Sequence, residues 1–294
     1  MPMAMTIGLI FYKQVSILAF LTPFLIGVML FFTYCNIDFK SLRFTKFHFA
    51  LIAVQLLGSA IAYFVLLPFN AILAQGAMIC ILAPTATSAP VITGMLGGNV
   101  ESLASYSLFC NLVVAFVAPL WFAFAGNVDA DSFWHAVLII CQKVFILLLL
   151  PFFLAFILSK FLPKVHNVIK KWKSVSFYLW SFALVIITGK TVLFVVEESS
   201  TSYWAEIALA VAALIACISQ FLVGRSIGTK LDNTISGGQG LGQKNTILAI
   251  WMAQTYLNPV ASVAPGAYIL WQNIVNSYQV WRKEQEKPNQ NSNA

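Results

Sequence analysis

The sequence predicts an all-α polytopic membrane protein with about nine transmembrane helices. Of its 294 residues, 60% are hydrophobic and 9% are charged, whereas about a quarter of a soluble domain is charged. Mean hydropathy is +0.85. The apolar stretches have the length of a helix that crosses the hydrocarbon core, and they lack the alternation of barrel strands. We therefore expect residues 1–294 to form a single transmembrane unit.

The apolar stretches follow one another with short polar loops between them. No basic residue precedes Lys13 and no small-residue cleavage site follows the first stretch, so we expect a retained helix rather than a signal peptide. Residues 282–294 are polar and are expected to form a disordered tail. The expected spans are 15–35, 48–68, 71–96, 103–125, 133–158, 175–196, 203–223, 234–257 and 261–281.

The net charge of +7 comes from the loops. Most basic residues follow the first, fifth, seventh and ninth spans, and these loops share one side if the spans alternate. Since basic loops stay in the cytoplasm, we expect the N-terminus outside and the C-terminus inside. Short loops without an outer glycosylation sequon suit a bacterial inner (plasma) membrane. The basic residues are Lys40, Arg43, Lys46, Lys160, Lys164, Lys170, Lys171, Lys173, Arg225, Lys230, Arg282, Lys283 and Lys287.

The third span contains two prolines in its middle. Pro84 and Pro90 flank Thr85, Thr87 and Ser88. Each proline removes a backbone donor and disfavours helix at the preceding residue. The sequence therefore predicts that this helix is broken between the two prolines.

The eighth span carries a run of glycines before Lys244. Gly237, Gly238, Gly240 and Gly242 each weaken a helix by about 1 kcal/mol relative to alanine. We therefore expect a second helix break at the glycines. Irregular backbone at membrane depth needs protein, water or a ligand to satisfy its freed polar groups.

The two breaks lie five spans apart, so their helices cross the membrane in opposite directions. The same shift pairs the fourth span with the ninth, and both contain the tripeptide VAP, at residues 117–119 and 263–265. Paired breaks in oppositely oriented halves indicate the midplane site of a secondary transporter. We therefore expect an inverted structural repeat with two broken, crossing helices.

Four segments, distributed from the first span to the last, resemble the bile acid:sodium symporter family: IGVMLFFTYCNIDFKSLR, TSAPVITGMLGGN, GQKNTILAIWMA and PGAYILWQN. The resemblance implies inverted repeats divided into a panel and a core domain, in a form that lacks the first helix of ten. Panel helices would be about 15–35, 133–158 and 175–196, and core helices about 48–125 and 203–281. Members of the family carry organic anions such as bile salts, pantoate or other carboxylates and sulfates.

The sequence departs from this family where the resemblance implies sodium ligands. Ala89 and Pro90 stand in place of a Ser-Asn pair, Gly240 in place of a glutamate and Lys244 in place of a glutamine. Four oxygen-bearing side chains are thus replaced, and no span carries a central carboxylate. We expect no metal site and no cofactor, and we expect the Lys244 ammonium to stand in for bound sodium. Sodium-coupled symport is the alternative.

Substrate contacts are expected at both breaks and in the last span. Freed helix N-termini and Lys244 make the centre electropositive, which suits a carboxylate or sulfate. The resemblance places the substrate-contacting residues at Thr87, Asn245 and Asn273, with Gln272 in place of a histidine. Further polar candidates are Thr85, Ser88, Thr93, Gln239, Gln243 and Thr246. These features predict transport of a small organic anion by alternating access.

Other functional classes fit the sequence less well. It contains no HExxH or GxSxG motif and no intramembrane carboxylate pair, and GGQGLGQK lacks the spacing of a phosphate loop. We therefore expect a protein that is not an enzyme. A channel or a membrane receptor is the alternative of another class. The expected partners are a small organic anion and the lipid bilayer, without nucleic acid; the sequence specifies neither the substrate nor the oligomeric state.

Overall fold

The computed structural model describes residues 2–37, 42–86, 88–126, 132–197 and 203–285. Helices make up 88% of these residues, and no strand occurs among them. Within the described ranges, five helical segments are long and apolar enough to cross a membrane: Tyr12–Cys35, Lys46–Leu66, Val100–Ala125, Phe133–Phe161 and Trp204–Lys230. The prediction of an all-α integral membrane protein is confirmed, while the count of nine spans and the inverted repeat stay predictions.

In the first half of the chain, one of the expected spans is divided into two helices, α5 and α6. Asn70 caps α5 by accepting a hydrogen bond from Leu73 N (2.9 Å), and Asn99 caps α7 by accepting one from Ser102 N (2.9 Å). Between α6 and α7, Gly97 adopts a φ of +79°, which favours glycine. The elements are α1 (Pro2–Ile10), α2 (Tyr12–Ser16), η1 (Ile17–Leu21), α3 (Thr22–Cys35), α4 (Lys46–Leu66), α5 (Ala71–Leu82), α6 (Ala89–Leu96) and α7 (Val100–Ala125).

In the second half, another expected span is divided into two helices, α12 and α13. Its elements are α8 (Phe133–Phe161), α9 (Pro163–Lys170), α10 (Lys173–Glu197), α11 (Tyr203–Lys230), α12 (Thr234–Gly242), α13 (Thr246–Tyr256), η3 (Pro259–Ser262) and α14 (Val263–Gln285). Helix α14 thus continues four residues into the segment expected to be a tail, so that expectation is wrong for residues 282–285. Residues 286–294 lie outside the described residues.

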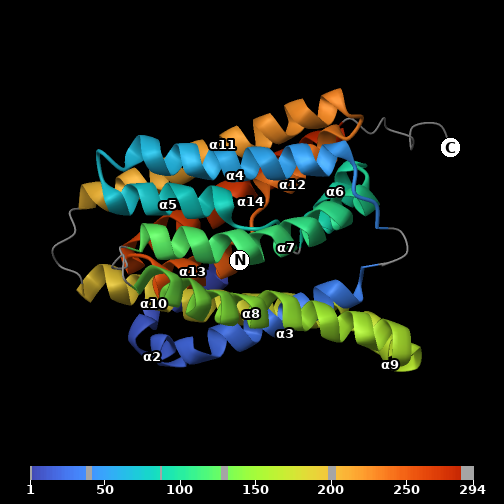
Figure 1. Ribbon diagram of the computed structural model, residues 1–294, viewed down its shortest axis with the longest axis horizontal. Helices are drawn as coiled ribbons and strands as arrows, with labels where there is room; N and C mark the ends of the chain where they lie inside the picture. Colours follow the sequence, from blue (N-terminus) through green and yellow to red (C-terminus); the bar gives the residue numbers. More distant parts are fainter. Residues whose placement is uncertain (1, 38–41, 87, 127–131, 198–202, 286–294) are drawn as a thin grey trace.

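The helices form two groups with a shared interior (Figure 1). Helices α3, α8 and α10 lie side by side, and α1 and α2 pack on α10. On the other side of the molecule, α11 packs against α5, α12 and α14, and α4 packs on α5. Helix α7 lies between the groups and contacts α8. The two broken helices therefore belong to the larger group and face the three-helix layer.

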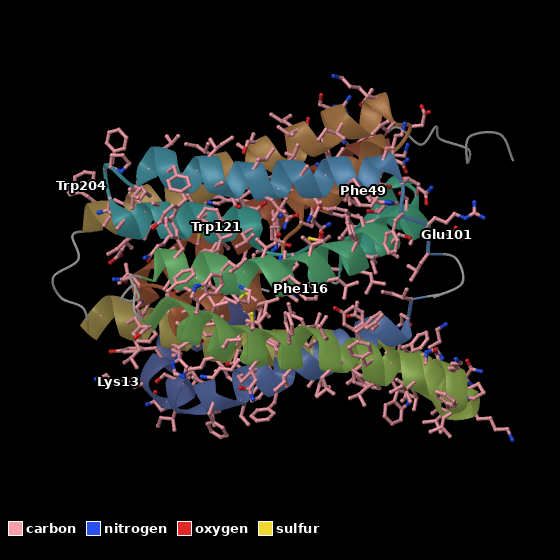
Figure 2. The ribbon with its side chains drawn as sticks, in the orientation of Figure 1. Lys13, Phe49, Glu101, Phe116, Trp121 and Trp204 are labelled. Atoms are coloured by element: carbon pink, nitrogen blue, oxygen red, sulfur yellow. The ribbon has the colours of Figure 1, made fainter. Side chains whose placement is uncertain are left out.

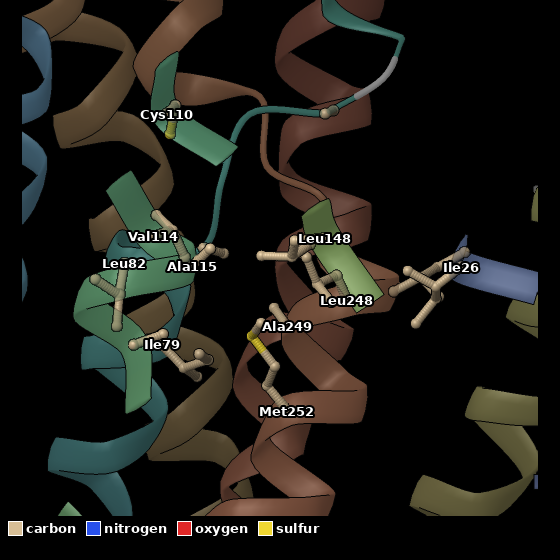
Figure 3. Packing of buried hydrophobic residues seen from close by; sticks show 14 of the residues in the cluster. Ile26, Ile79, Leu82, Cys110, Val114, Ala115, Leu148, Leu248, Ala249 and Met252 are labelled. Carbon is tan, nitrogen blue, oxygen red and sulfur yellow. The ribbon is translucent and has the colours of Figure 1, made fainter. Parts of the chain in front are cut away.

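Apolar side chains cover both the outside and the inside of the molecule. Phe116, Phe49 and Trp204 are more than half exposed, as lipid-facing residues are, and Figure 2 shows Trp204 at the edge of the molecule. Inside, Leu82 of α5 and Leu248 of α13 belong to one buried cluster that reaches across both groups (Figure 3). Lipid tails can cover this apolar exterior, so the fold does not need a polar surface around its helices.

The glycine run does not break its helix. Gly237, Gly238, Gly240 and Gly242 all lie within the helix α12, so the expected break at these residues is wrong. They instead allow close packing, because a Cβ on Gly237 would collide with the backbone of Gly224 in α11. Small residues at helix contacts let two backbones approach within a membrane. Packing against α11 therefore compensates for the low helix propensity of glycine.

Candidate functional site

The first break lies between α5 and α6. Helix α5 ends at Leu82, Pro84 stands in the connecting segment, and α6 begins at Ala89. Pro90 is the second residue of α6, so it starts that helix rather than interrupting one. Thr87, expected to contact substrate, lies outside the described residues. The break therefore lies between the two prolines, as predicted, and Pro84 stands inside it.

The second break runs beside the first. It comprises residues 243–245, between α12 and α13. Asn245 N donates to Pro84 O (2.8 Å), and Ala86 N donates to Gln243 O (3.0 Å), which forms a short antiparallel bridge between the segments. Figure 3 shows the two connecting segments passing each other. Each break thus supplies hydrogen-bond partners that the other has lost.

The end of α5 leaves carbonyl oxygens that need donors, and distant side chains supply them. Gln55 Nε2 of α4 donates to Leu82 O (2.8 Å) and Ala83 O (3.0 Å). Gln220 Nε2 of α11 lies 3.4 Å from Cys80 O. The sequence analysis missed Gln55 and Gln220, although an isolated amide in an apolar span is a signal that could have identified both.

The end of α12 is satisfied in the same way. Thr85 Oγ1 donates to Gly240 O (2.9 Å), and Tyr268 OH of α14 donates to Gly242 O (2.9 Å). Two helix C-termini, each the negative end of a helix dipole, therefore meet at this point. Such a place favours a positive charge.

Lys244 supplies that charge. The residue is only 1% exposed, and its Nζ donates to Ile81 O in the last turn of α5 (2.8 Å). Its backbone N donates to Gln272 Oε1 of α14 (2.9 Å). The ammonium thus points into the protein rather than toward an interface, and it links the second break to the first.

The positions that the resemblance assigns to sodium ligands offer no side-chain oxygen. A Cβ on Gly240 would lie 2.9 Å from a ring carbon of Tyr106, so an aromatic ring occupies the space beside it. Ala89 is buried and carries no side-chain oxygen. The ammonium of Lys244 donates a hydrogen bond to Ile81 O. No cluster of metal-binding side chains occurs among the residues that the structure describes.

A cavity of about 980 Å³ lies next to the breaks. It is lined by residues of α3, α6, α7 and α14, and it extends from the breaks to Trp281 and Glu284 near the C-terminal end of α14. Phe32, Val91 and Met95 are among its apolar lining residues. The predicted site residues that line it are Ser88, Pro90, Gln243, Lys244, Asn245, Thr246, Gln272 and Asn273.

Three of the predicted polar candidates are not among the lining residues. Thr85 uses its hydroxyl on Gly240 O, and Gln239 Nε2 donates to Gln279 Oε1 of α14 (2.8 Å). Thr93 is fully buried in α6, and its Oγ1 has no hydrogen-bond partner among the described residues. Ser88 Oγ donates to Gln243 Oε1 (3.2 Å), and Gln243 Nε2 donates to Gln239 Oε1. Thr85 therefore connects the first break to α12, and Gln239 connects α12 to α14.

The amides that line the cavity are partly used by the fold. Asn245 Oδ1 caps α13 by accepting from Leu248 N (3.3 Å), while Asn273 Nδ2 donates to Ile269 O in its own helix (2.6 Å). Gln272 Oε1 accepts from Lys244 N. In Asn245 and Gln272 the carbonyl oxygen is thus engaged, and the amide nitrogen forms no hydrogen bond to any described residue. These nitrogens are donors suited to an anionic oxygen.

The chain matches the model of one protein family. The Sodium Bile acid symporter family model matches residues 22–198, which is more than half of the chain. No curated protein matches the chain. The matched part includes the first break and ends before the second, where Lys244 lies.

Proposed function

Because the chain belongs to the Sodium Bile acid symporter family, a family of membrane transporters rather than enzymes, we propose that it carries a small organic anion by sodium-independent alternating access. The observation that carries the proposal is the hydrogen bond from Lys244 Nζ to Ile81 O at the crossing of the two breaks. A fixed ammonium there supplies the charge that a bound sodium ion would otherwise supply.

The helix ends at the crossing favour this arrangement. The C-terminal ends of α5 and α12 bring carbonyl oxygens together, and these interact favourably with a cation. An ammonium buried in a protein needs such acceptors, because an unpaired buried charge costs several kcal/mol. Lys244 is covalently attached, so its charge is present without uptake of an ion.

The N-terminal ends of the second half-helices favour an anion. Helix α13 begins at Thr246 and α6 at Ala89, both beside the cavity. Several first-turn N–H groups are already bonded, such as those of Thr246 and Leu248, so what both helices offer an anion is chiefly the positive end of the dipole. Together with the amide nitrogens of Asn245 and Gln272, which bond to no described residue, these dipole ends suit a carboxylate, sulfate or sulfonate.

The position of the cavity suggests how access alternates. It is lined by α3 of the three-helix layer, by α6 and α14 of the larger group, and by α7, which lies between the two groups. In the orientation expected from the loops, its Glu284 end faces the cytoplasm, and we propose that the cavity is the inward-facing access path. Movement of the larger group as the core against α3, α8 and α10 as the panel would close this end and open the other.

Ligand-dependent thermal stability of the purified protein tests this function. A ligand that binds only the native state raises the melting temperature with its concentration. Butane-1-sulfonate and cholate are measured in sodium and in choline buffer, with Lys244→Ala and the control Lys143→Ala, since Lys143 is an exposed lysine outside this cavity. The account expects stabilisation that is equal in both buffers, retained in the control and lost in Lys244→Ala.

Two other results would favour the alternatives. Stabilisation that requires sodium would indicate the sodium-coupled symporter. Binding without saturable uptake in proteoliposomes would indicate a receptor, and uptake that rises linearly with concentration would indicate a channel.

A further inference from the structure

The wall that α14 contributes to the cavity carries amides on successive turns. Gln272 and Asn273 lie beside the breaks, and Asn276 follows one helical turn later. Asn276 is 7% exposed, so its side chain is more than nine-tenths buried. Its Oδ1 nevertheless has no hydrogen-bond partner among the described residues.

This oxygen differs from the other amide oxygens near the breaks. Gln272 Oε1 accepts from Lys244 N, and Asn245 Oδ1 accepts from Leu248 N. Both are satisfied within the protein, whereas Asn276 Oδ1 accepts a hydrogen bond from no residue in the described part of the chain. A buried acceptor left in this state costs about 1–3 kcal/mol. A ligand in the cavity that supplies a donor would remove that cost.

The cavity therefore has two chemically distinct ends along α14. Near the breaks it offers donors, namely the amide nitrogens of Asn245 and Gln272, which bond to no described residue. One turn further, Asn276 offers an acceptor. Since four residues of helix rise about 6 Å, a ligand that satisfies both ends carries its anionic group and a donor at about this separation.

We propose that Asn276 is a specificity-determining residue that accepts a hydrogen bond from the substrate, and that the substrate is an organic anion bearing a hydroxyl or an N–H about 6 Å from its anionic group. This proposal rests on the proposed anion transport. It adds a selectivity that the charge of Lys244 does not provide, because a positive charge attracts all organic anions alike.

Two matched ligands test the proposal: butane-1-sulfonate and 4-hydroxybutane-1-sulfonate, which differ by one terminal hydroxyl. Their dissociation constants are measured by calorimetry on the full chain and on Asn276→Leu, which keeps a similar volume without the acceptor. Asn276→Ala is the second variant in case leucine prevents folding. The control is Asn111→Leu, since Asn111 Oδ1 is also buried without a partner but does not line the cavity.

We expect the wild type to bind the hydroxylated sulfonate roughly two- to tenfold more tightly, which corresponds to one net hydrogen bond. The preference should vanish in both Asn276 variants, with the affinity for butane-1-sulfonate nearly unchanged, and should persist in Asn111→Leu. Equal binding of the two sulfonates by the wild type, or a preference that survives in the Asn276 variants, would overturn the proposal and leave anion transport intact. Failure of both sulfonates to bind the wild type would count against the proposed function as well as this one.

Discussion

The two helix breaks differ in how they arise and in how they are enclosed. The first separates α5, which ends at Leu82, from α6, which begins at Ala89, and it reaches an exposed Ser88, whereas the second comprises residues 243–245 within a stretch, 241–250, that is buried throughout. Pro84 lies inside the first break. No residue of the second break is glycine or proline, although glycines precede it.

The difference shows that proline and glycine act on a helix in different ways. Proline removes one backbone donor at its own position, so its effect is local, and Pro119 and Pro151 stand inside the continuous helices α7 and α8. Glycine only weakens a helix, and close packing of Gly237 against α11 outweighs that loss. The position of the second break depends on partners that are distant in the sequence, such as Pro84 O, which accepts from Asn245 N.

The largest expected effect comes from Gly237→Ala in α12. The added Cβ would overlap the backbone of Gly224, and backbone cannot move aside as a side chain can. We expect a loss of about 3 kcal/mol or more in unfolding free energy, seen as a fall of several degrees in the melting temperature in detergent. The control is Gly266→Ala in α14, where a Cβ would meet no atom within 4 Å and helix propensity predicts a gain of up to about 1 kcal/mol. Equal melting of the two variants would mean that the glycines are not needed for packing.

An intermediate effect is expected from Thr85→Val, which removes the hydroxyl that donates to Gly240 O. The carbonyl would then be buried without that donor, at a cost of about 1–3 kcal/mol. Thr255→Val is the matched control, because the exposed Thr255 bonds only to Trp251 O in its own helix. If both valine variants melt like the wild type, the contact between Thr85 and α12 contributes nothing to the crossing.

The smallest effect is expected from Pro84→Ala. Alanine restores a backbone donor. However, Ala86 N and Asn245 N still donate across the two segments, and these bonds prevent both segments from becoming helical. We expect a change within about 1 kcal/mol, chiefly from the unfolded chain, with anion binding retained. A loss as large as that of Thr85→Val would show that the proline itself, and not the bonds across the segments, maintains the first break.

The sequence predicted the features that local chemistry determines. The break at Pro84 and the family were both predicted, and both are confirmed. The role of the glycines was predicted wrongly, because propensity alone says nothing about a neighbouring helix such as α11. The short helix α1 was not predicted, and it packs on α10, far along the chain.

The candidate site was predicted only in part, for a related reason. Lys244 and Asn245 stood out because polar residues in an apolar span are rare, and both line the cavity. Thr93 and Gln239 stood out equally, yet neither is among the lining residues. Which side of a helix faces a cavity depends on tertiary packing. For the same reason Asn276, which lies in a polar stretch near the chain end, was not predicted as a site residue.

The most direct test of the account is saturable uptake of taurocholate into proteoliposomes, measured with an inward sodium gradient and with choline replacing sodium. The account predicts the same initial rate under both conditions, and a rate at least about tenfold lower in Lys244→Ala, since a charged hydrogen bond is worth about 1.5–3 kcal/mol. Uptake that requires sodium, or that is unchanged when Lys244 is replaced, would contradict the claim that this lysine takes the place of the ion.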